Sequence, residues 1–169
     1  RALEITRAIG DRAGEARTLA NKGVAYKELG DLAGATEMQR ESIALTEAIG
    51  ERPALPAAYV NLGVLLQRKG DVAEAIGLFQ RAVTLAHEMR SSRLESAALA
   101  NQANAVAVLG DIPRAVALMR RSMELAERSD ELGAYFMGRL KTIASRVVKD
   151  IRGRGLWIGI ELHEAARPY

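Results

Sequence analysis

The chain of 169 residues contains no cysteine and few aromatic residues. The absence of cysteine excludes disulfide bonds, thiolate metal sites and cysteine nucleophiles. Aromatic residues make up 4% of the chain although 49% of it is hydrophobic, so its apolar content is mostly Ala, Leu, Ile and Val. This composition favours closely packed helices over a β-sandwich. No apolar run approaches the roughly 18 residues of a membrane-spanning helix, and we expect no membrane partner.

The net charge is small and unevenly distributed. The formal charge is +3; residues 1–127 contain 16 basic and 16 acidic residues, whereas residues 128–169 contain 8 and 5. The basic excess therefore lies in the last quarter of the chain and says nothing about the partners of the rest. The basic cluster near the C-terminus is short and has one aromatic neighbour, so we expect no nucleic-acid partner.

A forty-residue period organises the first 127 residues. The recurring residues are Gly30-Asp31, Gly70-Asp71 and Gly110-Asp111, then Asn21, Asn61 and Asn101, then Ala35, Ala75 and Ala115. Each period predicts two helices, because apolar residues recur at helical spacing, a glycine can end the first helix and an aspartate can cap the second. Residues 3–10 match residues 43–50, so we expect the chain to begin inside the second helix of an earlier, truncated repeat.

This pattern resembles the tetratricopeptide repeat, in its forty-residue subclass. The resemblance is carried by Asn61-Leu62-Gly63, Leu66, Gly70-Asp71, Ala75, Phe79 and Ala82. It covers residues 1–127 and implies an all-α solenoid of antiparallel helix pairs, with the end of one repeat followed by three repeats. The sequence departs from the pattern at Gln39 and Met119 (an aromatic residue in the family), Lys22 and Gln102 (Leu) and Ala103 (Gly). We expect these departures to loosen individual contacts and not to change the fold.

The resemblance implies that the first helix of each pair lines a concave surface. Family members use an Asn on this helix to hydrogen-bond a peptide backbone, and a side-chain amide can both donate and accept. The resulting candidates are Asn21, Asn61 and Asn101 for the peptide backbone, with Arg17, Lys27, Arg68 and Asn104 for selectivity. The alternative is that these Asn residues hydrogen-bond only the neighbouring helix.

The sequence therefore predicts a non-catalytic protein–protein interaction scaffold that binds a peptide or protein in this groove. Of the residues four positions before each repeated Asn, only Arg17 is basic, whereas Ala57 and Ala97 are not. A basic clamp for a C-terminal carboxylate is incomplete, which disfavours a receptor for chaperone tails. The two histidines, His87 and His163, lie on different segments, and nothing else indicates catalysis. We expect no enzyme activity, no metal and no cofactor.

The period ends before the last quarter of the chain. We predict a capping helix over residues 128–145, with Ser129 as its N-cap, because a solenoid needs its last apolar face covered. Residues 146–169 are expected to form a short β-hairpin, with its glycine-rich turn over residues 152–155, or to be poorly ordered.

Residues 127–169 resemble a second family, ornithine aminotransferase, over part of its small domain. The matching residues are Val148-Lys149-Asp150-Ile151-Arg152-Gly153-Arg154-Gly155-Leu156-Trp157-Ile158-Gly159-Ile160-Glu161-Leu162, flanked by shorter matches. The resemblance implies a pyridoxal-phosphate enzyme as the parent, but none of that family's catalytic residues maps onto this chain. The alternative function is therefore a fragment or fusion of that enzyme, inactive by itself and not binding the cofactor.

The two resemblances together indicate a chimera, and the sequence does not distinguish a natural fusion from a designed or mis-joined one. We expect a cytoplasmic location, although a signal could have been lost with the truncated N-terminus. Self-association through the truncated ends of the solenoid is left open.

Overall fold

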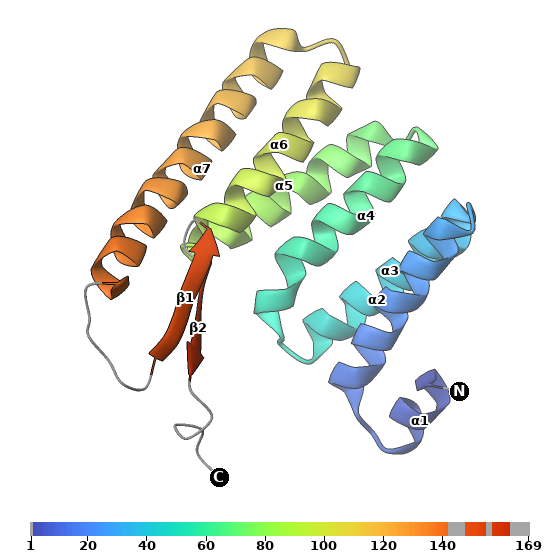
Figure 1. Cartoon of the computed structure of the whole chain (residues 1–169). Coiled ribbons are helices and arrows are strands. Elements are labelled where there is room, and N and C mark those ends of the chain that lie inside the picture. Colours follow the sequence, from blue (N-terminus) through green and yellow to red (C-terminus); the bar gives the residue numbers. More distant parts are fainter. Residues whose placement is uncertain (1, 142–147, 155–156, 163–169) are drawn as a thin grey trace. The chain divides into compact units, whose positions relative to one another are not determined.

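Figure 1 shows a computed structural model of the chain, which describes residues 2–141, 148–154 and 157–162. The chain divides into two compact units, Arg1–Ser122 and Met123–Tyr169, which are described separately below. The described residues form α1 (Ala2–Ala8), α2 (Arg12–Glu28), α3 (Leu32–Ala48), the 3-10 turn η1 (Arg52–Ala54), α4 (Leu55–Lys69), α5 (Val72–Glu88), α6 (Ser92–Val108), α7 (Ile112–Lys141), β1 (Val148–Arg154) and β2 (Trp157–Leu162).

Consecutive helices of the first unit form the predicted array of helix pairs. Helix α2 packs on α3, α4 on α5 and α5 on α6, and the first helices α4 and α6 also touch. The prediction of an all-α solenoid is thus confirmed. We refer to α2–α3, α4–α5 and α6 with the start of α7 as the first, second and third repeats.

The ends of the helices follow the predicted signals with two exceptions. Gly70 ends α4 with a φ of 94°, a left-handed conformation that costs glycine no Cβ strain. Asp11 and Asp31 each accept a hydrogen bond of 2.8 Å from a backbone N–H in the first turn of the following helix. Asp71, in contrast, makes no such capping bond, so the predicted side-chain cap of α5 is wrong, and Ser91 at the start of α6 makes none either.

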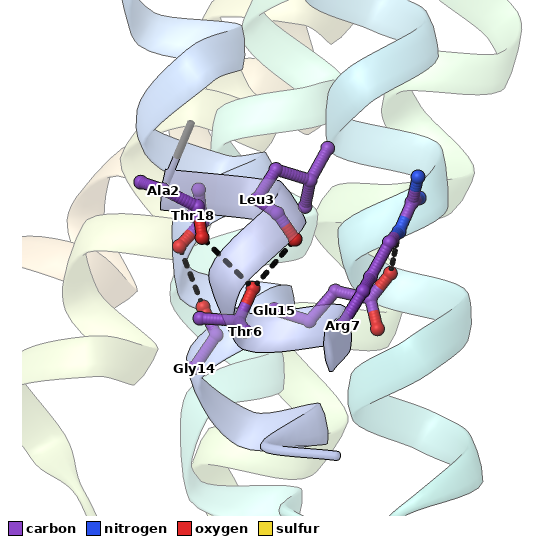
Figure 2. Close-up of polar contacts among 7 residues, drawn as sticks. All are labelled: Ala2, Leu3, Thr6, Arg7, Gly14, Glu15 and Thr18. Carbon is purple, nitrogen blue, oxygen red and sulfur yellow. Dashed lines mark hydrogen bonds and ion pairs between the residues drawn. The ribbon is translucent and has the colours of Figure 1, made fainter. Parts of the chain in front are cut away.

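Helix α1 is held against α2 by side-chain contacts near its end (Figure 2). Arg7 Nε donates to Glu15 Oε1 at 2.6 Å, and this hydrogen bond raises the pKa of Arg7. Thr6 and Thr18 instead donate back to backbone carbonyls of their own helices. The helical state of α1 agrees with the prediction that residues 3–10 repeat the end of α3.

The interior differs from repeat to repeat. In the second repeat the ring of Phe79 is fully buried against Gly63, where a Cβ would lie 2.5 Å from Phe79 Cε1. In the first repeat Gln39 occupies the position of Phe79 and is 2% exposed. Its Nε2 donates to the Ala20 carbonyl at 3.2 Å, while its Oε1 is buried and has no hydrogen-bond partner among the described residues.

Helix α7 corrects the predicted boundary of the capping helix. It continues from the third repeat through Ser129 to Lys141 without a break, so no new helix begins at Ser129. The repeat ends its second helices with glycine at residues 10 and 50, but residue 130 is Asp and the preceding residues favour helix. Residues 142–145 lie outside the described residues, and the docking of residues 128–145 as a cap stays a prediction.

Strands β1 and β2 form the predicted hairpin. They pair antiparallel, with Arg152 opposite Gly159 and Arg154 opposite Trp157. The expected turn over residues 152–155 is wrong in part, because Arg152 to Arg154 belong to β1 and only residues 155–156 separate the strands. Lys149 donates to Glu161 at 2.6 Å and thereby lowers the pKa of Glu161. Residues 163–169 lie outside the described residues.

Candidate functional site

The exposed faces of the first helices carry the repeated Asn residues. Residues four or seven positions apart lie on one side of a helix, so each Asn shares its face with a few neighbours. We call this set the first-helix row: Arg17, Asn21 and Val24 on α2, Ala57, Asn61 and Arg68 on α4, and Ala97, Asn101, Asn104 and Val108 on α6. Because α4 and α6 touch, two parts of the row lie on neighbouring helices.

Most side-chain amides of this row make no hydrogen bond to the described residues. Asn21, Asn61 and Asn104 are exposed and make no hydrogen bond through their side chains to the described residues. Asn101 is half-buried, and its Nδ2 donates to the Ala97 carbonyl of its own helix at 2.8 Å. The structural alternative requires hydrogen bonds from these Asn side chains to a neighbouring helix. Within the described part of the chain, none of the four amides makes such a bond.

The three basic candidates do not form one group. Arg17 and Arg68 belong to the first-helix row and are exposed. Lys27 lies six positions after Asn21, about 120° away around the helix, and pairs with Glu28 at 3.1 Å. Lys27 therefore does not share the face of Asn21, and the structure separates it from the other candidates.

A pocket that the sequence analysis missed lies beside the second repeat. It has a volume of about 380 Å³ and is lined by Arg52, Leu55, Tyr59, Gln80, Arg81, Thr84, Leu85 and Glu88. Tyr59 precedes Asn61 by two positions, which places it about 160° away around α4. The pocket therefore faces a different side of α4 from the first-helix row.

A network of polar contacts forms one wall of this pocket. Tyr59 is 3% exposed and donates to Glu47 Oε1 at 2.6 Å. Arg81 Nη2 donates to the same Glu47 oxygen and to the Tyr59 hydroxyl, both at 2.8 Å, and the guanidinium lies 4.3 Å from the centre of the Tyr59 ring. Burial, and then the hydrogen bond to Glu47, raise the pKa of Tyr59 to about 12.

The third repeat holds a related cluster around a buried carboxylate. Glu95 is 4% exposed, and its Oε1 accepts from Arg121 Nη2 at 2.6 Å. Its Oε2 lies 3.0 Å from Nδ1 of His87. Arg81 and Arg121 are forty residues apart, so the repeat period itself was a signal that could have pointed to both clusters.

The described residues contain no group of three or more His, Cys, Asp or Glu side chains that could hold a metal ion. None of their helices combines the length and the hydropathy needed to cross a membrane.

Comparison with known families identifies the repeat. Residues 16–49 and residues 54–129 match two tetratricopeptide repeat models, which together cover more than half of the chain. The chain belongs to the tetratricopeptide repeat family, as predicted.

Solved structures of the same fold include plant and animal proteins. The tetratricopeptide domain of Arabidopsis FLU superposes with a TM-score of 0.64 at 18% identity, covering 69% of this chain and 98% of that one. The N-terminal domain of stress-induced protein-1 from C. elegans gives 0.60 at 22% identity, covering 78% and 98%. The first tetratricopeptide domain of Spaghetti (RPAP3), bound to the HSP90 peptide SRMEEVD, gives 0.56 at 21% identity, covering 77% and 94%. At these identities the likeness establishes the fold.

The second resemblance is also confirmed, over a short stretch. Ornithine aminotransferase of Exiguobacterium is 67% identical over 43 residues, which are 25% of this chain and 11% of the enzyme. The Bacillus subtilis enzyme is 64% identical over 44 residues, which are 26% and 11%. The chain thus spans about a tenth of the length of these relatives.

Proposed function

We propose that residues 1–127 act as a non-catalytic scaffold that binds a peptide or protein along the first-helix row. The observation that supports this is the pair of exposed side-chain amides of Asn61 and Asn104 on the touching helices α4 and α6, which make no hydrogen bond to the described residues. Amides in this arrangement can donate to and accept from an extended backbone without reading its sequence. Arg17 and Arg68 would add selectivity for acidic groups at the ends of the row.

The expected ligand differs from a chaperone tail. The RPAP3 domain is bound to an HSP90 peptide, and this chain shares its fold. Ala57 and Ala97, however, stand one turn before Asn61 and Asn101, where a basic clamp would need long cationic side chains. The ligand that suits this row is an internal, extended segment with small or apolar side chains, which fit against Val24 and the two alanines.

A binding experiment on the whole chain tests this proposal. Peptides selected against the chain from a display library are titrated by calorimetry into the wild type and into Asn61→Ala combined with Asn104→Ala. We expect the double variant to weaken Kd at least tenfold, about 1.4 kcal/mol. Glu37→Ala, an exposed change on the second helix α3, is the control and should leave Kd unchanged. Equal affinity of the double variant for every selected peptide would contradict the proposal.

The match to ornithine aminotransferase favours a second candidate, a fragment or fusion of that enzyme that is inactive by itself. The described tail does not fit pyridoxal phosphate, because Lys149 is 56% exposed and its amine is engaged by Glu161 on the hairpin. We propose that the chain takes no cofactor. After incubation with pyridoxal phosphate and removal of the free cofactor by gel filtration, the protein should therefore keep no visible absorbance of a bound cofactor, and a transaminase assay with ornithine should give no product.

A further inference from the structure

The pocket beside the second repeat has a counterpart in the third repeat. At the forty-residue spacing, Leu55 corresponds to Glu95 and Arg81 corresponds to Arg121. In the third repeat the buried carboxylate of Glu95 accepts a hydrogen bond of 2.6 Å from Arg121. In the second repeat a leucine replaces that carboxylate, and a pocket of about 380 Å³ lies between Leu55 and Arg81.

The arginines of this pocket keep unused donors. Both hydrogen bonds of Arg81 use Nη2, so its Nε and Nη1 make no bond to the described residues. Arg52 likewise uses Nη2 for its 2.7 Å contact with Glu88. A guanidinium has five N–H donors in a planar fork that can receive a carboxylate through two parallel hydrogen bonds. Each arginine can thus donate hydrogen bonds to an additional carboxylate while keeping its present partner.

The remaining lining restricts what such a carboxylate is attached to. The half-buried Leu85 and the small exposed parts of Leu55 and Tyr59 offer apolar surface beside the two guanidinium groups. A compact inorganic anion would leave this surface uncovered, whereas an acid on a short alkyl stem would cover it. The volume lies within the range of about 300–1,000 Å³ that is usual for ligand pockets.

We propose that this pocket binds the glutamate side chain of an acidic peptide from a partner protein. The ligand's carboxylate takes the role that Glu95 has in the third repeat, with Arg81 and Arg52 as donors. Its methylene groups pack on Leu55 and Tyr59. This site faces a different side of α4 from the first-helix row, so it is a second binding surface and does not depend on that row.

Nuclear magnetic resonance of the full chain with a defined probe tests the proposal. The probe is the capped tripeptide acetyl-Leu-Glu-Leu-amide, followed through the Arg81 Nε–H and Tyr59 ring signals. We expect saturable shifts with this peptide and none with acetyl-Leu-Gln-Leu-amide. Equal shifts with the glutamine peptide would overturn the proposal. Equally strong binding of free glutarate would overturn its peptide part and indicate a site for small dicarboxylates.

Substitutions separate the pocket from the rest of the surface. Arg81→Gln should weaken probe binding at least tenfold and Arg52→Gln severalfold, whereas the exposed Arg114→Gln on α7 is the control and should change nothing. Leu55→Glu supplies the carboxylate of the third repeat from within the chain and should block the probe, unlike Leu55→Gln. Leu55 is buried, so its variants could fail to fold. In that event the test rests on Arg52→Gln, because the Arg52 side chain is exposed and its replacement should not affect folding. Unchanged affinity in both arginine variants would overturn the proposal.

Discussion

The second and third repeats solve the same packing problem in different ways. In the second repeat Gly63 on α4 faces the buried ring of Phe79 on α5. At the equivalent positions of the third repeat, Ala103 stands for the glycine and Met119 for the aromatic ring. The two substitutions occur together, and the geometry explains why: a Cβ at residue 63 would come within 2.5 Å of the Phe79 ring.

The first repeat differs from the second at only one of these two positions. It keeps the glycine, Gly23, but has Gln39 in place of the aromatic residue, and a Cβ at Gly23 would lie 3.2 Å from Gln39 Cγ. Polar side chains are buried around it; these are Thr36, Gln39, Ser42 and Thr46. A ring therefore requires a glycine opposite it, whereas a glycine does not require a ring. Of the three repeats, the second carries an aromatic ring at this position, whereas the first has Gln39 and the third Met119.

The largest expected effect is the loss of the ring in the second repeat. Phe79→Ala removes a fully buried side chain and should lower the free energy of unfolding by about 3–5 kcal/mol. Met119→Ala, at the equivalent and only half-buried position, should cost clearly less. Urea unfolding of both variants, followed by circular dichroism, measures the difference. Equal losses would mean that the two repeats are equally well packed.

A smaller effect is expected from filling the glycine positions. Gly63→Ala forces the Phe79 ring to move and should destabilise the chain by about 1–3 kcal/mol, in spite of the better helix propensity of alanine. Gly23→Ala meets only the flexible Gln39 side chain and one carbonyl at 3.2 Å, so its cost should be near zero. Thermal unfolding of the two variants measures both losses of stability. A smaller loss in Gly63→Ala than in Gly23→Ala would contradict this account of the two repeats.

The first repeat can be brought closer to the third by removing its buried amide. Gln39→Met eliminates a buried Oε1 atom that no described residue hydrogen-bonds, and Met is the residue of the third repeat at this position. The variant loses one hydrogen bond of 3.2 Å to Ala20. We expect a net stabilisation of about 1 kcal/mol, because an unsatisfied buried group costs more than one weak bond contributes. A drop in the urea midpoint would show that the amide is satisfied in solution.

The sequence predicted the helix pairs because the residues that end each helix act through their local conformation. A glycine such as Gly70 ends a helix through its own backbone conformation, and the forty-residue period repeated that signal. At the ends of the second helices the repeated residues are Gly10, Gly50 and Arg90. Arg90 has a φ of 54°, so it takes the same left-handed conformation without being a glycine. Residue 130, forty positions later, is Asp, and there α7 continues, because the residues before it favour helix.

The candidate site could be predicted only in part. The exposed positions of Asn61 and Arg68 followed from helical spacing, whereas the position of Lys27 on another face was overlooked. The pocket was not found, since it depends on side chains from η1, α4 and α5 that are far apart in the sequence. Such convergence is a property of the packed repeats and not of any one motif.

The effect that depends on pH concerns Tyr59, whose equivalents in the first and third repeats are the buried Leu19 and Leu99. Burial and the hydrogen bond to Glu47 raise the pKa of Tyr59 from 10.0 to about 12, so the native state keeps its proton at a pH where the unfolded chain has lost it. The stability that Tyr59 contributes is therefore fully present below pH 10 and is lost as the pH rises to 12. Tyr59→Phe removes this titration but not the ring.

Urea unfolding of the wild type and of Tyr59→Phe at pH 8.5 and pH 11 measures this contribution. The stability advantage of the wild type should shrink at the higher pH, and the variant should lack this part of the alkaline decline. Because every other residue is the same in both proteins, the pH dependence that they share cancels in the difference. A constant difference at both pH values would mean that the Tyr59 hydroxyl has its ordinary pKa and that the second repeat gains nothing from its contact with Glu47.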